Sequence, residues 1–467
     1  MIEARCPGCA ERDALIEALR KRVDELERLV KDLQARLGAN ASNSSLPPSA
    51  NPPAAPKPVV KKPTGRKSGA QPGHEPHLRQ RLPAERVTRF VRLLPRQCRG
   101  CGAALAAEAG PHDPEPSWHQ VVELPERLAD VTEYQGHART CAGCGTVTHA
   151  AIPATVRRHA VGPRLTAFLA YLRAAHQVSQ RGLEEIVTTA LHVPLSLGTI
   201  NYLERQTSAA LAPAHAEALQ AVRQAPVKHV DETGWKRAGG WLWLAATATV
   251  AAFVVHARRS AAGLRALLGE AIIGFVCSDR WSVYDQLPPE RRQLCWAHLK
   301  RDFQKCVDRG GAAAVVGRAG LRVVAGVFAC WHRHRDGPPG GEQLLEELAP
   351  LARRLERALR AGQRCADGPA ATFCANLLGL WPALWLFAVE AGVEPTNNHA
   401  ERLLRRGVLW RKRSFGSHSE AGCRFVERML TVVQTLRLQN RSALTFLHDA
   451  VAAHRAARPA PQLLNAG

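Results

Sequence analysis

The sequence lacks long apolar segments. Its first residues, MIEARCPGC, contain no apolar core of a signal peptide, and no run of about 18 apolar residues suggests a membrane span. A disulfide framework is not expected either, because the 13 cysteines are an odd number and six of them form C-x-x-C pairs. We therefore expect a soluble, cytoplasmic protein in which cysteine pairs bind metal.

Acidic residues are also scarce. The 41 Asp and Glu residues stand against 63 Lys and Arg residues, which gives a formal net charge of +22 and a pI near 10.1. Such an excess favours a polyanionic partner such as nucleic acid over a merely basic, solvated surface. With 467 residues, the chain exceeds what one hydrophobic core usually organises, and we expect about two to four domains.

Residues 1–38 combine a cysteine pair with a helical repeat. Apolar residues recur at alternating steps of three and four; they are Ile16, Leu19, Val23, Leu26, Val30, Leu33 and Leu37. The repeat predicts that residues 11–38 form a two-stranded parallel coiled coil, with Arg22 able to pair with Glu27 of the partner helix, and hence a homodimer or higher oligomer. A hairpin within one chain or a loosely held helix is the alternative. Cys6 and Cys9 precede the repeat, where a zinc ion shared across a dimer is an open alternative.

Residues 39–82 form a Pro-rich, basic linker. The stretch ANASNSSLPPSANPPAAPKPVVKK cannot bury enough apolar surface to offset its chain entropy. The following GRKSGAQPGH carries Arg66 and Lys67 beside glycines that let the backbone approach a ligand closely. We expect this segment to bind a phosphate backbone or a DNA groove, with a merely solubilising linker as the alternative.

Residues 83–158 look like a zinc ribbon. Short β-like runs, RVTRFVRLLP, WHQVVELPE and ADVTEYQGHART, alternate with two C-x2-C pairs. Each pair can place two thiolates on one tetrahedral ion, and neighbouring glycines suit the tight turn. We predict that Cys98, Cys101, Cys141 and Cys144 hold one structural Zn²⁺, with reduced, buried thiols as the alternative.

Residues 159–222 follow a helical pattern. Three helices are expected, over LTAFLAYLRAAH, SQRGLEEIVTTAL and INYLERQTSAAL, with the turn VPLSLGT before the last. Ser196 and Thr199 are candidates to cap the last helix. The turn predicts a helix-turn-helix-like DNA-binding domain, although a plain helical bundle that links domains would give the same pattern.

Residues 223–430 change to an α/β pattern. Three strand-like runs, VKHVDETG, GWLWLAATAT and AAFVVHAR, precede an amphipathic helix and a buried strand, AIIGFVCSD. This order opens a ribonuclease-H-like fold, in which the first and fourth strands are neighbours and their terminal acids can share metal ions. Asp231 and Asp279 are those acids. Glu232 and Asp285 are nearby alternatives, but Glu232 is expected on the opposite face of its strand.

A third acid opens a strongly basic helix. After an inserted helical subdomain at about residues 305–390, Glu401 begins a stretch that offers one acid to metal and many cations to phosphate. The predicted DNA-binding residues of this helix are Arg402, Arg405, Arg406, Arg411, Lys412 and Arg413. Glu394, which precedes a proline in an expected loop, is the alternative acid. Residues 431–467 are expected to form a C-terminal helix and tail.

Together these segments resemble the DDE-type transposases of the bacterial insertion-sequence family sixty-six (IS sixty-six, TnpC-type). The resemblance covers nearly the whole chain and rests on SNSSLPPS, GRKSGAQPGH, the cysteine pairs, GTINYLER, HVDETGW, SDRWSVYD, CWAHLKRDF and EPTNNHAERLLRRGVLWRKRSFGSHSEAGCRFVERMLTVVQT in this order. It implies that Asp231, Asp279 and Glu401 are the catalytic ligands of two Mg²⁺ or Mn²⁺ ions. It also implies small accessory proteins encoded by the element, and a location at the bacterial nucleoid when DNA is bound.

One further pair comes with this resemblance. Cys295-x2-His298 is similar to a C-x2-H pair found after the second acid in many DDE transposases. We expect it to contribute to packing rather than to metal binding.

The sequence thus predicts an enzyme that binds the ends of an insertion sequence and catalyses Mg-dependent DNA cleavage and strand transfer. Two other functions remain open. A ribonuclease-H-like, structure-specific nuclease would use the same acids but would need neither the coil nor the cysteine pairs. A DNA-binding regulator derived from a mobile element would use the basic helices and leave the acids idle.

Overall fold

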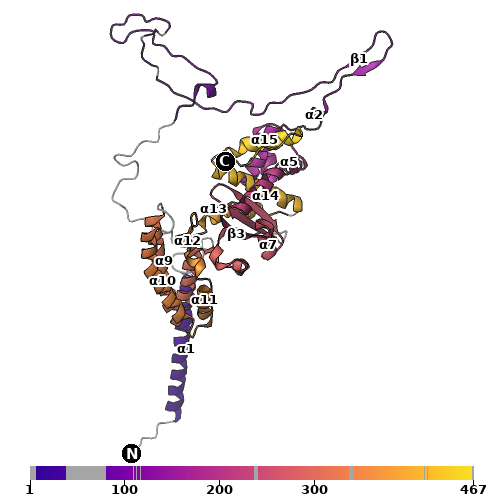
Figure 1. Ribbon diagram of the computed structural model, residues 1–467. Coiled ribbons are helices and arrows are strands. Elements are labelled where there is room, and N and C mark those ends of the chain that lie inside the picture. The colour runs from indigo at the N-terminus through magenta and orange to yellow at the C-terminus, as the bar shows by residue number, and fades with distance from the viewer. Residues whose placement is uncertain are drawn as a thin grey trace, which may run out of the picture. The chain divides into compact units, whose positions relative to one another are not determined.

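The structure, a computed structural model, describes residues 7–37, 80–108, 110–111, 113–115, 117–235, 240–335, 341–414, 416–417 and 419–464. The chain divides into two compact units, one of residues 56–132 and one of residues 1–55 with 133–467. The larger unit is mostly helical and contains a mixed five-stranded sheet (Figure 1). This sheet carries the candidate site.

The N-terminal repeat forms one helix, α1 (Pro7–Leu37). Its apolar seam lies open to solvent, with Leu19, Val23 and Leu26 about half exposed, at 56 %, 50 % and 47 %. Arg22 pairs with Glu25 of the same helix at 2.6 Å. The helix of the predicted coiled coil is therefore present, and its pairing with a partner stays a prediction.

The unit of residues 56–132 contains little regular structure. A 3-10 turn, η2 (Ala84–Arg86), and a single bridge between Gln97 and Ala104 are its ordered elements among the described residues. The strands predicted over residues 86–95 and 118–126 are not formed. Among the described residues, no neighbouring strand bonds to their backbone. An unpaired strand gains too little stabilisation from hydrogen bonds and packing to form. In the larger unit, β1 (Ala138–Thr140) pairs with β2 (Val147–His149) as an antiparallel hairpin.

Helices occupy the next segment, as predicted. A short α2 (Ala154–Arg157) is followed by α3 (Pro163–Ala175), α4 (Gln180–Ala190), α5 (Leu197–Ala210) and α6 (Ala212–Gln224). Ser196 caps α5 by accepting the Thr199 N–H at 3.2 Å, which confirms the cap. Apolar side chains of α3, α4 and α5 form a small core of their own, which is made of Val161, Leu169, Leu183, Val187, Ile200 and Leu203.

The sheet combines an antiparallel half with a parallel half. β3 (Val227–Trp235), β4 (Gly240–Ala246) and β5 (Ala251–His256) form an antiparallel meander, and α7 (Ala261–Leu268) then leads to β6 (Phe275–Ser278). β6 returns beside β3 in parallel, and β7 (Arg292–Leu294) extends the parallel half after two short turns, η3 (Ser282–Gln286) and η4 (Pro289–Arg291). The strand order is β5-β4-β3-β6-β7, so the first and fourth strands of this sheet are neighbours, as predicted.

A helix closes the open edge of the sheet at β5. α14 (Glu420–Leu438) presents Glu427, Thr431 and Thr435, whose side-chain oxygens accept the N–H groups of Val255, Phe253 and Ala251 at 2.6, 2.9 and 3.1 Å. The spacing of the acceptors along the helix matches the spacing of the donors along the strand, because four residues of helix and two residues of strand both advance about 6 to 6.6 Å. An edge that would otherwise be free to pair with another chain is thereby covered.

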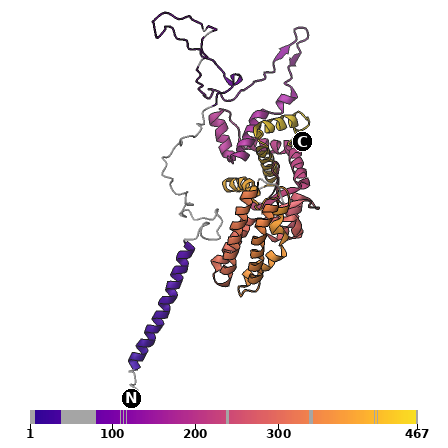
Figure 2. The same cartoon turned by 60° about the vertical axis from the view of Figure 1, so that its left-hand side comes forward.

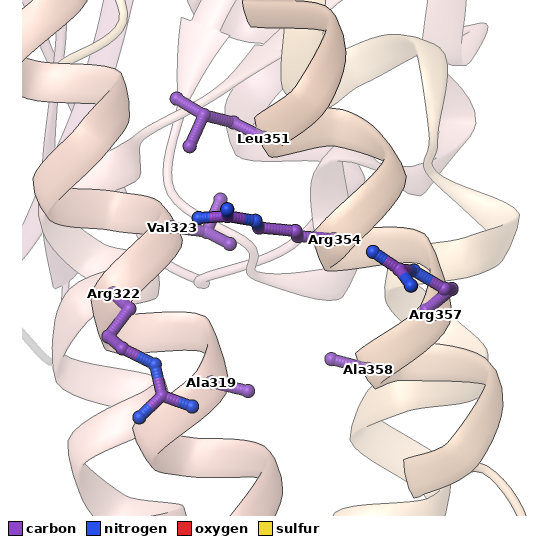
Figure 3. A pocket seen from close by; sticks show the side chains of 7 residues that line it. All are labelled: Ala319, Arg322, Val323, Leu351, Arg354, Arg357 and Ala358. Atoms are coloured by element: carbon purple, nitrogen blue, oxygen red, sulfur yellow. The ribbon is translucent and has the colours of Figure 1, made fainter.

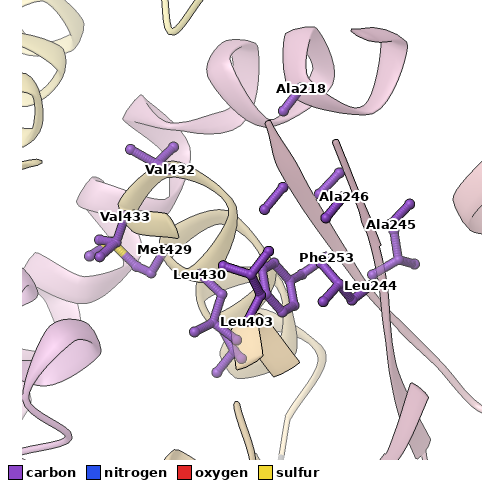
Figure 4. Packing of buried hydrophobic residues seen from close by; sticks show 14 of the residues in the cluster. Ala218, Leu244, Ala245, Ala246, Phe253, Leu403, Met429, Leu430, Val432 and Val433 are labelled. Carbon is purple, nitrogen blue, oxygen red and sulfur yellow. The ribbon is translucent and has the colours of Figure 1, made fainter. Parts of the chain in front are cut away.

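The main core lies between the sheet and the helices on it. Leu244 and Phe253 from the strands meet Leu403 from α13 (Asn398–Ser414) and Met429 and Leu430 from α14 (Figure 4). The last helix, α15 (Ala443–Arg455), packs on α3 and α5. There its Arg455 donates to the carbonyl oxygen of Val161 at 2.7 Å. The predicted C-terminal helix is therefore part of the larger unit.

The predicted helical insertion forms a second core. It comprises α8 (Trp296–Arg309), α9 (Gly311–His334), α10 (Glu342–Gly362), α11 (Gly368–Gly379) and α12 (Pro382–Val389). α9 and α10 run side by side as a long pair in both views (Figures 1 and 2). By length and composition alone α9 could cross a membrane, which the sequence analysis did not anticipate. Half of its apolar window is buried against other helices, as in the core helix of a globular unit.

Candidate active site

Asp231 and Asp279 lie at the same level of two neighbouring strands. β3 and β6 run parallel, with Val227 opposite Phe275 and His229 opposite Cys277. Continuing this register by two residues brings Asp231 opposite Asp279. Because neighbouring strands are about 4.8 Å apart, the two residues lie close together. Asp279 directly follows β6, whereas Asp231 lies in the middle of β3, so the prediction that it ends the first strand is wrong.

The charge around Asp231 is strongly negative. Burial raises the pKa of Asp231 well above its usual range, and the charges of Glu232, Asp279 and Glu401 raise it further. One oxygen of Asp231 accepts the Glu232 N–H at 2.9 Å, and one oxygen of Asp279 accepts the Trp281 N–H at 3.0 Å. Acids of β3, of the loop after β6 and of α13 therefore interact electrostatically, and Arg301, 3.8 Å from Oε1 of Glu401, offsets part of this charge. A cluster of carboxylates is an environment that a divalent cation stabilises.

Asn397 fixes the start of the helix that carries Glu401. Its buried side chain donates to the carbonyl oxygen of Val230 at 2.7 Å, and its own carbonyl oxygen accepts the Glu401 N–H at 3.2 Å. On the other side, the Asn397 Oδ1 lies 3.2 Å from Nδ1 of His229, whose pKa burial lowers to about 4. A neutral His229 is therefore the donor, and α13 is tied to the strand immediately before Asp231.

Gly407 lets α13 lie directly on the sheet. A Cβ atom at this position would come within 2.4 Å of Cδ2 of Leu242 on β4, too close for any side chain. The close approach keeps the first turns of α13, and with them Glu401, near the strands.

Cys295 and His298 lie beside Glu401, and Cys295, His298 and Glu401 offer ligand atoms within 4.8 Å of one another. The buried thiol of Cys295 accepts the N–H of Asn397 at 3.2 Å, and burial raises its pKa to about 11. Nδ1 of His298 lies 3.4 Å from Oε1 of Glu401, and both atoms are buried without a hydrogen-bond partner among the described residues. The contact with Asn397 packs Cys295 against the start of α13, but its cluster with His298 and Glu401 would also suit a metal ion, so packing stays a prediction. His298 faces the acids, which the sequence analysis did not anticipate.

The alternative acids are engaged elsewhere. Glu232 points to the other face of β3, where Tyr284 and Arg259 donate to it at 2.5 and 2.7 Å. Asp285 pairs at 2.7 Å with the buried guanidinium of Arg292, which also donates to the Asp279 carbonyl oxygen at 2.9 Å. Glu394 is exposed in the loop before α13. Arg292 therefore holds the backbone of Asp279, a role that no local motif indicated.

The cations of α13 divide into two groups. Five are exposed along the helix and available to a polyanion; they are Arg402, Arg405, Arg406, Lys412 and Arg413. Arg411 is instead half-buried and donates to the Gly234 carbonyl oxygen and to the Thr233 hydroxyl of β3. Arg413 also reaches the carbonyl oxygen of His176 at 3.1 Å. Arg411 thus holds α13 on β3. Arg66 and Lys67 lie outside the described residues.

Both cysteine pairs form the same turn. The carbonyl oxygen of Cys98 accepts the Gly102 N–H at 2.9 Å, and that of Cys141 accepts the Gly145 N–H at 2.9 Å. The two glycines have φ of +74° and +71°. Backbone and thiol hydrogen bonds lower the pKa of the Cys98 thiol, and the Thr146 hydroxyl lowers that of Cys144. Tight turns with acidic thiols suit thiolate ligands of zinc. Cys98 and Cys101 belong to the smaller unit, Cys141 and Cys144 to the larger one. Cys6 and the side chain of Cys9 lie outside the described residues.

Comparison with known proteins identifies two matches. A family model described as Transposase IS66 family matches residues 158–424, which include all three converging acids. A second model, described as a family of unknown function (DUF6444), matches residues 3–80. No curated protein and no solved structure matches the chain.

Proposed function

Because the chain belongs to the Transposase IS66 family, we propose that it is a DDE-type transposase that binds insertion-sequence ends and catalyses DNA cleavage and strand transfer. The observation that carries the proposal is the register of β3 and β6, which brings Asp231 opposite Asp279, together with the packing of α13, the helix of Glu401, on β3. The strand order β5-β4-β3-β6-β7 supports a ribonuclease-H-like catalytic domain of residues 223–430.

Asp231, Asp279 and Glu401 are the proposed ligands of two Mg²⁺ or Mn²⁺ ions. The donor set fits, since carboxylate oxygens are the ligands that hard divalent cations prefer, and Glu401 has a buried oxygen that lacks a hydrogen bond. When bound, such ions supply activation of the attacking hydroxyl and stabilisation of the leaving oxygen at a phosphodiester. His298 lies against Glu401 and would hold its carboxylate in place.

The protein's own contribution is to position the acids and the DNA. Asn397 and Arg292 fix the backbone at Glu401 and Asp279, and the exposed cations of α13 would neutralise phosphates beside the acids. Attack of water breaks one P–O bond and frees a 3′-hydroxyl at the element's end. That hydroxyl then attacks a target phosphodiester, so that one P–O bond forms as another breaks. No covalent protein–DNA intermediate is needed.

The remaining segments have supporting roles in this proposal. The exposed Asn201, Tyr202 and Arg205 of α5 offer polar and cationic groups for reading element ends, and the basic linker with Arg66 and Lys67 would add phosphate contacts. The four knuckle cysteines would hold Zn²⁺, and α1 would bring two chains together so that both ends are cleaved in one assembly. Accessory proteins encoded by the element are further partners of the proposed reaction.

The decisive test is metal-dependent nicking and strand joining on a duplex that carries the terminal repeats flanking this reading frame. We expect the wild-type chain to nick and join with Mg²⁺ or Mn²⁺, and Asp231→Ala and Asp279→Asn to bind the ends without cleaving them. Full cleavage by Asp279→Asn would overturn the assignment of the acids. Cleavage without joining would favour a nuclease, and metal-independent binding without nicking would favour a regulator.

A further inference from the structure

The helical insertion contains an arginine-lined groove. It lies between α9 and α10, has a volume of about 440 Å³, and is lined by Ala319, Arg322, Val323, Leu351, Arg354, Arg357 and Ala358 (Figure 3). The alanines and aliphatic side chains line it together with arginines from both helices. No acid is among the lining residues.

The three arginines have no acidic partner among the described residues; Arg357 donates from Nε to the carbonyl oxygen of Arg353 at 3.4 Å. Within the described part of the chain, Arg322, Arg354 and Arg357 are exposed, and none forms an ion pair. The acids nearest along α10 are taken by other bases, since Glu356 pairs with Arg360 at 2.7 Å and Glu347 pairs with Arg333 and His334. Three like charges in one groove repel one another until an anion enters.

The groove fits a chain of phosphates better than a small anion. Arg354 and Arg357 are three residues apart on one helix face, so they are about 4.5 Å apart along the axis, and Arg322 lines the groove from α9. A phosphodiester strand presents one charge about every 3.4 Å along the duplex axis. An enclosed site for a single small anion would instead need buried donors, and all three arginines are exposed.

We propose that the α9–α10 groove binds the sugar-phosphate backbone of duplex DNA, as a second contact apart from the acids and the cations of α13. The proposal rests on the proposed function. It gives the insertion a task of its own, namely to hold DNA that extends from the site of cleavage.

The test is the salt dependence of DNA binding by the full chain, measured by fluorescence anisotropy with a duplex of unrelated sequence. The triple variant Arg322→Gln, Arg354→Gln, Arg357→Gln should lower the slope of log affinity against log salt by about 2 to 3, since each lost phosphate contact removes about 0.9. The control triple Arg318→Gln, Arg353→Gln, Arg364→Gln removes the same charge from exposed positions of α9, α10 and the loop after it that do not line the groove. It should change the slope by less than about 1.

The groove has no role if its triple variant keeps the wild-type slope, or if both triples lower the slope equally. Thermal unfolding of both triples should match the wild type, because the replaced side chains are exposed, so a fall in slope does not reflect loss of fold. Failure of the proposed function is separate: it would be seen as wild-type protein that does not bind or nick DNA at all. Asp279→Asn, which lacks a catalytic acid but keeps the groove, should retain the full slope.

Discussion

Asn397 donates a 2.7 Å hydrogen bond to the carbonyl oxygen of Val230, which joins the start of α13 to β3 one residue before Asp231. The two residues are far apart in sequence, and their contact fixes the distance between the first and third acids. A side chain that touches no substrate thereby sets the geometry of the site.

Asn397→Ala should weaken metal binding and cleavage while leaving DNA binding intact. The buried Val230 carbonyl oxygen would lose its donor, which costs about 1–3 kcal/mol, and α13, which carries Glu401, would lose this side-chain tie to β3. The backbone carbonyl oxygen that accepts the Glu401 N–H would remain. The measurement is nicking against Mg²⁺ concentration, in which the variant should need more Mg²⁺ for half-maximal rate. Asn398→Ala, at the exposed neighbouring position, is the control. An unchanged Mg²⁺ requirement in Asn397→Ala would leave the residue with a structural role only.

Asp231→Asn should abolish cleavage, and it should also make the metal-free protein more stable. The folded-state pKa of Asp231 is raised, so the ionised form is disfavoured in the fold, and stability present at low pH is lost as pH rises through that pKa. The Asn variant carries no charge at this position and does not lose this stability. The difference between its thermal midpoint and that of the wild type should therefore grow with pH, and about 1 kcal/mol of stability corresponds to about 2–4 °C. Unfolding is measured in chelator at several pH values.

When Mg²⁺ is added in place of chelator, the wild type should become more stable than Asp231→Asn. Mg²⁺ should raise the midpoint of the wild type and leave Asp231→Asn nearly unchanged, because binding to the folded state alone stabilises it. Glu290→Gln, which removes an exposed acid, is the control and should follow the wild type throughout. A wild type that is insensitive to Mg²⁺ would contradict a metal site at these acids.

Zinc should be present in the purified protein and depend on the cysteines of the two C-x2-C pairs. Cys101→Ser and Cys141→Ser should each lower the zinc content of purified protein, measured by elemental analysis, since each removes one of four thiolates. Cys365→Ser, outside the knuckles, should not. If only one of the two variants lost zinc, the pairs would not share an ion.

Leu26→Asn should dissociate the proposed dimer, whereas Leu29→Asn should not. Both leucines are about half exposed on α1, but only Leu26 belongs to the repeating seam. Light scattering on the two variants, and on a chain without residues 11–38, measures the mass directly. Equal masses for all three proteins and the wild type would remove the coil from the assembly.

Local patterns predicted most helices and strands of the larger unit, because apolar periodicity reports burial directly. The order of strand runs around Asp231 and Asp279 also predicted that β3 and β6 are neighbours. The strands that were predicted in residues 56–132 but are not formed have a common cause. Residues 86–95 read as a strand by composition, yet a strand needs a partner that composition does not supply.

Long-range contacts were beyond the reach of the sequence. Asn397 donates to a backbone oxygen 167 residues away and Arg292 to one 13 residues away, and no spacing in the sequence marks either residue. Arg411 looked like its cationic neighbours on the same helix, and only the fold shows that it bonds β3 instead. His298 and Cys295 were interpreted as a pair, and only the fold shows that both lie beside Glu401.

The helix that covers the sheet edge at β5 is synthesised much later than β5 itself. Glu427, Thr431 and Thr435 reach back 172 to 184 residues to bond β5. At a synthesis rate of about 5–20 residues per second, β5 leaves the ribosome roughly ten seconds or more before its covering helix exists. The nascent chain must keep an unpaired strand edge soluble for that interval. Aggregation during synthesis, more than instability of the finished fold, is therefore the hazard that this architecture carries.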